Sequence, residues 1–302
     1  MNKHTPLSAN GSLLERASQV FDLRKAVADN VVELPTPAVF VQAAPVTPRT
    51  ETLPLHTPRA FAGRQGSVDR DALKEAGFIL PDMPAGLLGE EFRLVKRQLL
   101  IDAKANPAPK GRMILVASAK PNEGKTFSAI NLALSMAAEK DVEVLLVDAD
   151  FAKPEILATL GLEDGPGLMD ALADPTLDVE SCIVRTDVAG LYVLPAGQQT
   201  NSDTEQLASV HTAAVLETLL TSNPARIVIV DSPPALAASP ASVLALHAGQ
   251  CVMVVKADRT TEAELRDALG LLHGCETIRL LLNAVSYKAD SRSFGTYYGY
   301  GD

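Results

Sequence analysis

The sequence has few of the residues that mark several common classes of protein. Its 302 residues include no tryptophan, 4% aromatic residues and three cysteines. Cys182, Cys251 and Cys275 have the spacing of neither a disulfide framework nor a metal site, so we interpret them as buried hydrophobic residues in a reducing compartment. No apolar run reaches the roughly 18 residues of a membrane-spanning helix, and no apolar segment follows the first charges as in a secretory signal. We therefore expect a cytoplasmic protein with no membrane span of its own.

Positive charge is also scarce. The chain has 27 Lys and Arg residues against 37 Asp and Glu residues, a formal net charge of −10. This balance argues against a dedicated nucleic-acid-binding protein, because such proteins need basic surface. The apolar residues make up 47% of the chain, enough for a substantial core built mainly from aliphatic side chains.

Two segments of different character precede the main domain. Residues 12–29 have apolar residues at helical spacing, and Ser12 with Glu15 forms a capping box. Six prolines follow within residues 35–58, which predicts an extended linker. The amphipathic helix either docks on a partner or a second protomer, or has no specific role. We divide the chain into an N-terminal helix, a Pro-rich linker, the main domain and a flexible tail: 1–34, 35–68, 69–290 and 291–302.

Apolar runs and helical patterns alternate from residue 113 onward. The predicted strands are 113–118, 143–148, 191–194, 226–231, 250–255 and 278–283. The predicted helices between them are 125–139, 205–222, 239–247 and 261–272, and two more, 69–76 and 89–103, come before the first strand. Continuous apolar runs are typical of strands covered on both faces. The pattern predicts an α/β fold with a doubly wound, mostly parallel sheet flanked by helices, which binds ligands at the carboxyl ends of its strands.

The first of these strands leads through a loop into Gly124-Lys125-Thr126 at the start of a helix. Strand, loop and helix in this order are typical of a phosphate-binding loop. Gly124 would let the backbone approach phosphate, Lys125 would reach the outer phosphates, and the Thr126 hydroxyl would hold Mg²⁺. Ala119 replaces the first glycine of the usual pattern, and an ordinary strand-to-helix turn is the alternative interpretation.

Carboxylates follow two of the predicted strands. Asp148 and Asp150 come at the end of the second strand, and Asp231 ends the fourth. One such carboxylate could simply cap a loop. Three beside a phosphate loop suit a magnesium nucleotide, since Mg²⁺ prefers oxygen ligands and Asp231 has the form of a Walker B acid. Asp148 or Asp150 could orient or deprotonate an attacking hydroxyl.

These three segments together resemble the deviant-Walker P-loop ATPases, the superfamily of MinD and ParA. Within that superfamily, residues 85–302 resemble most the bacterial tyrosine kinases of capsule and exopolysaccharide systems, and the N-terminal extension resembles that of the exosortase-associated subtype. Lys120 stands where the superfamily has its signature lysine, and Asn283 is placed like the kinases' adenine-contacting asparagine.

The resemblance implies a P-loop domain that binds ATP with Mg²⁺ and transfers phosphate to tyrosine. It implies that Asp148, Asp231 and Thr126 manage the metal, and that Asp150 accepts the phenol proton. Lys120 and Lys125 would stabilise charge on the transferred phosphoryl group. The nucleotide would contact the following residues: Pro121, Asn122, Glu123, Gly124, Lys125, Thr126, Phe127 and Asn283.

The helix predicted at 89–103 carries a charged triplet. Glu90, Arg93 and Lys96 recur at intervals of three, which alone is typical of a solvated face. The spacing also resembles the Glu-x-x-Arg-x-x-Arg oligomerisation motif of the kinases, with Lys in place of the last Arg. The resemblance therefore implies a homo-oligomer, either a dimer or a ring.

The end of the chain is rich in tyrosine and glycine. Of five tyrosines, four lie in the last sixteen residues, and Tyr297, Tyr298 and Tyr300 lie in the last eight. A segment with so few branched aliphatic residues has no reason to be buried, so these phenols would be reachable. The resemblance implies that a neighbouring subunit phosphorylates them in trans. A low-complexity tail without chemistry is the alternative.

The resemblance also implies a partner. Kinases of this type without membrane spans are activated by the cytoplasmic tail of a membrane polysaccharide co-polymerase, which would recruit this chain to the inner face of the membrane. The competing hypothesis is a MinD- or ParA-like ATPase that positions cargo and transfers phosphate only to water. A regulatory nucleotide-binding module with negligible turnover is a third possibility.

Overall fold

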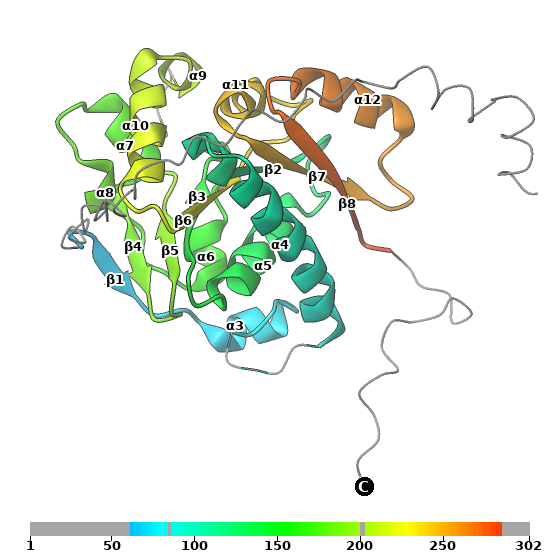
Figure 1. The fold of residues 1–302 in the computed structure, drawn as a ribbon, viewed down its shortest axis with the longest axis horizontal. Helices are drawn as coiled ribbons and strands as arrows, with labels where there is room; N and C mark the ends of the chain where they lie inside the picture. Colours follow the sequence, from blue (N-terminus) through cyan, green and yellow to red (C-terminus); the bar gives the residue numbers. More distant parts are fainter. Residues whose placement is uncertain (1–60, 82, 84–85, 200–202, 286–302) are drawn as a thin grey trace, which may run out of the picture. The chain divides into compact units, whose positions relative to one another are not determined.

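A mostly parallel β-sheet forms the centre of the fold (Figure 1). The computed structural model describes residues 61–81, 83, 86–199 and 203–285. The chain forms two units, 1–56 and 57–302, and all described residues belong to the second. The predicted N-terminal helix, the Pro-rich stretch at 35–58 and the tyrosine-rich tail lie outside the described residues.

The described part of the chain contributes eight strands to one sheet, in the order β1-β4-β5-β3-β6-β2-β7-β8. Their bounds are Arg64–Gly66 (β1), Met113–Ser118 (β2), Glu143–Asp148 (β3), Val184–Thr186 (β4), Leu191–Leu194 (β5), Arg226–Asp231 (β6), Gln250–Lys256 (β7) and Thr277–Asn283 (β8). Only β4 and β5 pair antiparallel among these strands. The sequence-based prediction of a doubly wound, mostly parallel sheet is confirmed.

Helices cover both faces of the sheet, because alternate side chains of each central strand point to opposite faces. Ile114 and Val116 of β2 pack into one apolar cluster, and Met113, Leu115 and Ala117 pack into the other. The first cluster includes residues of α3 (Arg70–Glu75), α4 (Leu87–Ala105), α5 (Lys125–Ala137) and α6 (Ile156–Leu160). The second includes residues of α7 (Leu168–Ala173), α8 (Val179–Cys182), α9 (Asp203–Leu207), α10 (Val210–Thr221), α11 (Pro240–His247) and α12 (Glu262–Leu271). A 3₁₀ turn, η1 (Pro109–Arg112), leads into β2.

The structure differs from the sequence-based prediction at several places. The short helices α6, α7 and α8 were not predicted. The predicted helix 205–222 is divided into α9 and α10, and Ser209 caps the second of these by accepting a hydrogen bond from the Thr212 amide. Strand β4 was not predicted, since three residues carry too little pattern. Strand β1 lies inside the range 35–68 that we interpret as a linker, and it pairs with β4, so this end of the range belongs to the sheet.

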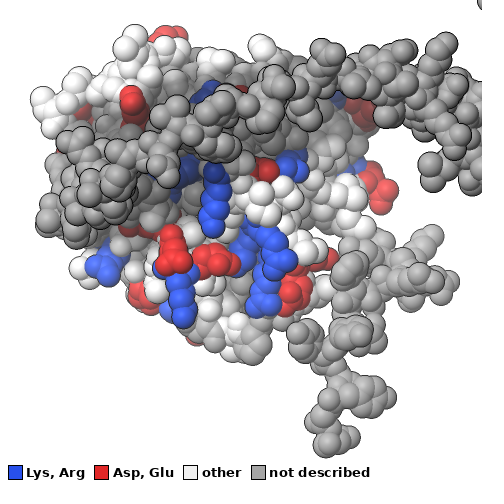
Figure 2. All heavy atoms as spheres, in the orientation of Figure 1, with Lys and Arg blue, Asp and Glu red and all other residues white. Residues whose placement is uncertain are grey.

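Three further features can be compared with the expectations from composition: the cysteines, the hydropathy of the helices and the surface charge. All three cysteines are buried and unpaired, as predicted. Between residues 61 and 285, no described helix combines the length and the hydropathy that crossing a bilayer requires. Figure 2 shows basic and acidic side chains next to one another on the visible face, so neither sign of charge forms a broad field there.

Candidate functional site

The loop between β2 and α5 forms the first wall of the site. Gly124 precedes the helix with φ 96°, a left-handed conformation, and no side chain caps the helix. The amide groups of the first turn are therefore open to an anion, which the helix dipole also favours. A Cβ atom at Gly124 would lie 2.1 Å from Nδ2 of Asn283, so the left-handed conformation favours glycine and a larger residue would also displace the Asn283 side chain.

The sheet register brings the acidic residues to this loop. Asp148 at the end of β3 is paired in register with Asp231 at the end of β6, and Asp231 is also paired with Val116 of β2. Asp148 and Asp231 are 1% exposed and Asp150 is 5% exposed. Adjacent parallel strands therefore gather three buried carboxylates beside the start of α5.

Lys125 supplies the positive charge among these acids. Its Nζ atom lies 2.5 Å from Oδ2 of Asp150 and 3.4 Å from the hydroxyl of Thr126. The Lys125 and Asp150 side chains are 11% and 7% exposed, respectively. The pair thus joins the loop after β2 to the loop after β3 inside the protein.

Asp231 has an oxygen that this structure leaves free. Its Oδ1 atom is buried and has no hydrogen-bond partner among the described residues. Burial raises the pKa of Asp231 to about 7, although Lys125 and a hydrogen bond from Thr126 act in the opposite direction. Removing solvent from a carboxylate is costly unless a cation or a donor replaces it, so this oxygen fits a metal ligand.

The donor set suits magnesium bound together with a phosphate. In the described part of the chain, no three His, Cys, Asp or Glu side chains group so that they could hold a metal by themselves. Mg²⁺ typically takes one or two protein oxygens, and phosphate and water supply the rest. Thr126 and Asp231 offer such oxygens, so the residues present fit the ion.

Asp148 is engaged differently from the other two acids. Its Oδ1 and Oδ2 atoms accept hydrogen bonds from the amides of Asp150 and Ile156, at 3.2 and 3.1 Å. Burial raises its pKa to about 6 despite these two bonds. Both oxygens hold the backbone that presents Asp150, so Asp148 supports the site in this structure, and its predicted metal role stays a prediction.

Lys120 does not join this cluster. Its Nζ atom pairs instead with Oε1 of Glu264 in α12, at 2.6 Å. Glu123 is also turned toward this side and is 3% exposed. It accepts hydrogen bonds from the Lys120 amide at 2.9 Å and from the Thr260 hydroxyl at 2.5 Å.

The sequence did not identify the residues that support the loop from this side. Thr261 and Glu264 form a capping box on α12 that the Thr-x-x-Glu spacing could have revealed, but spacing cannot reveal the contact with Lys120. Lys256, at the end of β7, donates to the carbonyl oxygen of Asn122 at 3.0 Å. These contacts tie the phosphate loop to the β7–α12 connection.

The remaining predicted nucleotide contacts differ in their surroundings. Asn283 lies at the loop and donates from Nδ2 to the carbonyl oxygen of Glu123 at 2.9 Å. Pro121 and Asn122 are exposed. Phe127 packs its ring against Phe78, with 4.8 Å between ring centroids, so its ring serves the packing of α5.

The predicted oligomerisation residues are not all on one surface. Glu90 and Arg93 form an exposed ion pair at 2.5 Å on α4. Lys96 is 9% exposed, and its amine contacts the carbonyl oxygen of Ser135 and the carboxylate of Glu139, both at 2.7 Å. Lys96 therefore anchors α4 to the end of α5 and is not available on the surface that Glu90 and Arg93 form.

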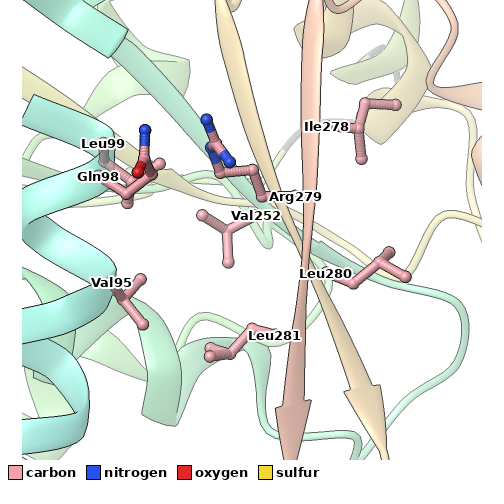
Figure 3. Close-up of a pocket in the computed structure, with 8 residues that line it drawn as sticks. All are labelled: Val95, Gln98, Leu99, Val252, Ile278, Arg279, Leu280 and Leu281. Atoms are coloured by element: carbon pink, nitrogen blue, oxygen red, sulfur yellow. The ribbon is translucent and has the colours of Figure 1, made fainter. Parts of the chain in front are cut away.

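A separate cavity of about 290 Å³ lies between α4 and β8. In Figure 3, Arg279 and Leu281 of β8 point toward α4. Arg279 also donates a hydrogen bond to the Asp102 carboxylate of α4 at 2.7 Å. No lining residue belongs to the phosphate loop or to the acidic cluster, so this cavity is not part of the site described above.

The sequence matches a known protein family. The model of the AAA domain family matches residues 111–281, more than half of the chain. The chain belongs to this family. Two relatives are CapB of Staphylococcus aureus, 28% identical over 72% of this chain and 93% of CapB, and the tyrosine-protein kinase Wzc of Salmonella typhimurium, 27% identical over 75% of this chain.

A solved structure agrees with the fold. The kinase domain of the Escherichia coli tyrosine kinase ETK superposes with a TM-score of 0.59 at 22% identity, covering 78% of this chain and 99% of that domain. This structure shows the fold, and the sequence relatives confirm the resemblance to bacterial tyrosine kinases. The chain spans nearly all of CapB, but only 31% of Wzc and 25% and 28% of two EpsB relatives from Ralstonia.

Proposed function

We propose that this protein is an ATP-dependent protein-tyrosine kinase of the kind that regulates exopolysaccharide or capsule synthesis. One observation carries this proposal: the buried Lys125–Asp150 pair and the unpartnered oxygen of Asp231 meet at the uncapped start of α5. Charged groups at this position suit a polyphosphate and an acceptor hydroxyl. Relatives named as tyrosine kinases support the choice of acceptor.

In the proposed reaction, the α5 amides and Lys125 hold the phosphates, and Asn283 lies near the base. Thr126 and Asp231 would hold Mg²⁺, which neutralises charge on the outer phosphates when bound. The bond between the γ-phosphorus and the leaving β-phosphate oxygen breaks while a tyrosine oxygen forms the new bond. Asp150 accepts the phenol proton. A phosphate that draws Lys125 away from Asp150 would leave that carboxylate free to do so.

The proposed acceptors are Tyr297, Tyr298 and Tyr300 of another protomer, which lie outside the described residues. Glu90 and Arg93 would contribute to the contact between protomers, because their pair is exposed. The proposed activator is the cytoplasmic tail of a membrane polysaccharide co-polymerase. Such a partner would recruit the kinase to the inner face of the membrane.

Intact mass measured after incubation with ATP and Mg²⁺ tests the proposal. We expect mass increases of one or more phosphates, which are lost in Lys125→Met and strongly reduced after removal of residues 297–302. Undiminished labelling of the truncated chain would remove the tail as the main acceptor. Release of free phosphate without any mass change would instead identify an ATPase. Mixing the truncated chain with a full-length Lys125→Met chain tests transfer in trans, since only the truncated chain then has activity.

A further inference from the structure

The amine of Lys120 is held on α12, away from the carboxylates of the site. Nζ of Lys120 lies 2.6 Å from Oε1 of Glu264, a contact between residues 144 positions apart. The two side chains are 44% and 28% exposed, respectively. Lys125, five residues further along, makes the buried contact with Asp150. The two lysines of the loop thus have separate carboxylate partners.

Glu264 is held in place by its own helix. Its Oε2 atom accepts a hydrogen bond from the amide of Thr261 at 2.9 Å, and the Thr261 hydroxyl accepts one from the amide of Glu264 at 3.3 Å. One carboxylate oxygen therefore caps α12, and the other is directed at Lys120. The position of the acceptor for Lys120 is fixed before any ligand arrives.

The chain segment before α12 also holds the phosphate loop. The Thr260 hydroxyl donates to Glu123, and the same hydroxyl accepts from the amide of Lys256 at 3.0 Å. The Lys256 amine reaches the carbonyl oxygen of Asn122. These contacts hold Asn122 and Glu123, which follow Lys120, and Glu123 also accepts a hydrogen bond from the Lys120 amide. The backbone at Lys120 is therefore fixed, and its side chain is the part that can move.

We propose that Glu264 is a positioning residue that binds Lys120 away from the phosphate site while no nucleotide is bound. Lys120 must then leave Glu264 to reach the phosphates of a nucleotide. A half-exposed ion pair is weak, so a polyphosphate carrying more negative charge can replace it. Nucleotide binding then competes with the Lys120–Glu264 pair. This inference rests on the proposed function, since it takes the phosphates as the second partner of Lys120.

Four variants of the full chain test the inference: Glu264→Gln, Glu262→Gln, Lys120→Met, and Lys120→Met combined with Glu264→Gln. The Glu264→Gln change keeps a side-chain oxygen for the Thr261 amide but removes the charge that binds Lys120. Glu262 is the matched control, since it lies in the same helical turn, is 84% exposed and pairs with Arg266. Far-UV circular dichroism and thermal melting establish that each variant is folded.

The first measurement is the Kd of a methylanthraniloyl ATP analogue with Mg²⁺. We expect Glu264→Gln to bind about 2- to 5-fold more tightly, as for the loss of a weak competing pair. Glu262→Gln is expected to match the unaltered chain, and Glu264→Gln is expected to have no effect in the Lys120→Met background. Equal tightening in that background, or in Glu262→Gln, would overturn the inference.

The second measurement needs no nucleotide. Acetylation of Lys120 by a small reagent, followed by peptide mass spectrometry, is expected to be several-fold faster in Glu264→Gln than in Glu262→Gln. Equal rates would show that Glu264 does not hold the lysine, even in a chain that binds ATP. Failure of the unaltered chain to bind the analogue would instead contradict the proposed function, and with it the role of Lys120 at the phosphates.

Discussion

The amine of Lys125 and the carboxylate of Asp150 lie 2.5 Å apart, with 11% and 7% of their side chains exposed. Lys125 is the first residue of α5, which follows β2, and Asp150 lies in the loop after β3. Each charge depends on the other. Removing one partner leaves a buried, uncompensated charge, which strongly destabilises the folded protein. The same two residues are the proposed phosphate ligand and the proposed proton acceptor, so folding and chemistry depend on one contact.

The first prediction concerns the stability that this pair provides. We expect Lys125→Met to lower the free energy of unfolding of the nucleotide-free protein by about 3 kcal/mol, because it leaves the buried Asp150 carboxylate without its positive partner. Lys125→Met combined with Asp150→Asn should lose less than the sum of the two single changes, by at least about 1 kcal/mol. Urea denaturation at pH 8 measures both quantities.

The control for this cycle is Lys153→Met. Lys153 is 67% exposed and pairs with Glu155 on the surface, so its loss should cost less than about 0.5 kcal/mol. Strict additivity of the Lys125 and Asp150 changes would show that the two charges do not stabilise one another.

Much of the fold was predictable because its signals are local. β2, β3 and β6 each contain at least four consecutive apolar residues, and β3 and β6 end on an aspartate, so both the strands and the acidic cluster could be predicted from them. The short strands β1 and β4 have three residues each, and their pairing comes from tertiary contacts. No periodic pattern can develop over such a length.

The parts of the site that escaped prediction depend on contacts between distant segments. The interval of three that unites Glu90, Arg93 and Lys96 predicts one drifting face, yet a helical rotation of about 300° per three residues turns Lys96 toward α5. The partner of Lys120 is 144 residues away. Sequence spacing specifies neither contact, because both arise only when helices pack on the sheet.

The second prediction concerns the pH dependence that Asp231 causes. Its pKa is about 7 in the folded chain against 3.8 for an unperturbed carboxyl, so the folded state binds this proton more tightly. The resulting stabilisation is complete below about pH 4 and is lost as the pH rises through 7. At about 1.4 kcal/mol per pKa unit, Asp231→Asn should be more stable than the unaltered chain at pH 8 by about 2 to 4 kcal/mol.

Urea denaturation between pH 4 and pH 8, with EDTA and without nucleotide, tests this second prediction. The stability difference between Asp231→Asn and the unaltered chain should grow with pH and level off near pH 8. Glu262→Gln, at an exposed carboxylate, should show no such growth. A difference that is constant over the whole range would contradict burial as the cause of the raised pKa.

The third prediction separates two reasons for glycine at position 124. Gly124→Ala should lower the free energy of unfolding by about 2 kcal/mol or more. The alanine would have to adopt a φ of 96°, and its methyl group would lie 2.1 Å from Asn283. Gly77→Ala is the matched control, since Gly77 has a φ of 77° but nothing within 4 Å of the added atom. The free energy of unfolding of that variant should fall by about 1 kcal/mol, and its nucleotide affinity should not change. Equal losses in the two variants would mean that contact with Asn283 has no energetic effect.

The last prediction concerns a buried arginine at the opposite end of β6 from Asp231. Arg226 is 7% exposed and bridges Glu143 of β3, at 2.6 Å, and Glu180 of α8, at 2.5 and 3.1 Å. The planar guanidinium binds Glu143 through Nε and Glu180 through both terminal nitrogens, a geometry that the single nitrogen of a lysine does not reproduce. Arg226→Lys should therefore lower the free energy of unfolding by about 2 kcal/mol, and Arg226→Met by about 3 to 5 kcal/mol.

Because Arg226 lies five residues before Asp231, the Arg226→Lys chain that remains folded should keep its affinity for ATP. Urea denaturation and nucleotide titration at 10–20 °C measure the two effects separately. Arg266→Lys is the control, because its pair with Glu262 is exposed on both sides and should contribute less than about 0.5 kcal/mol. If Arg226→Lys were as stable as Arg266→Lys, one carboxylate would be enough to hold this corner of the sheet, and the bridge to α8 would not contribute to stability.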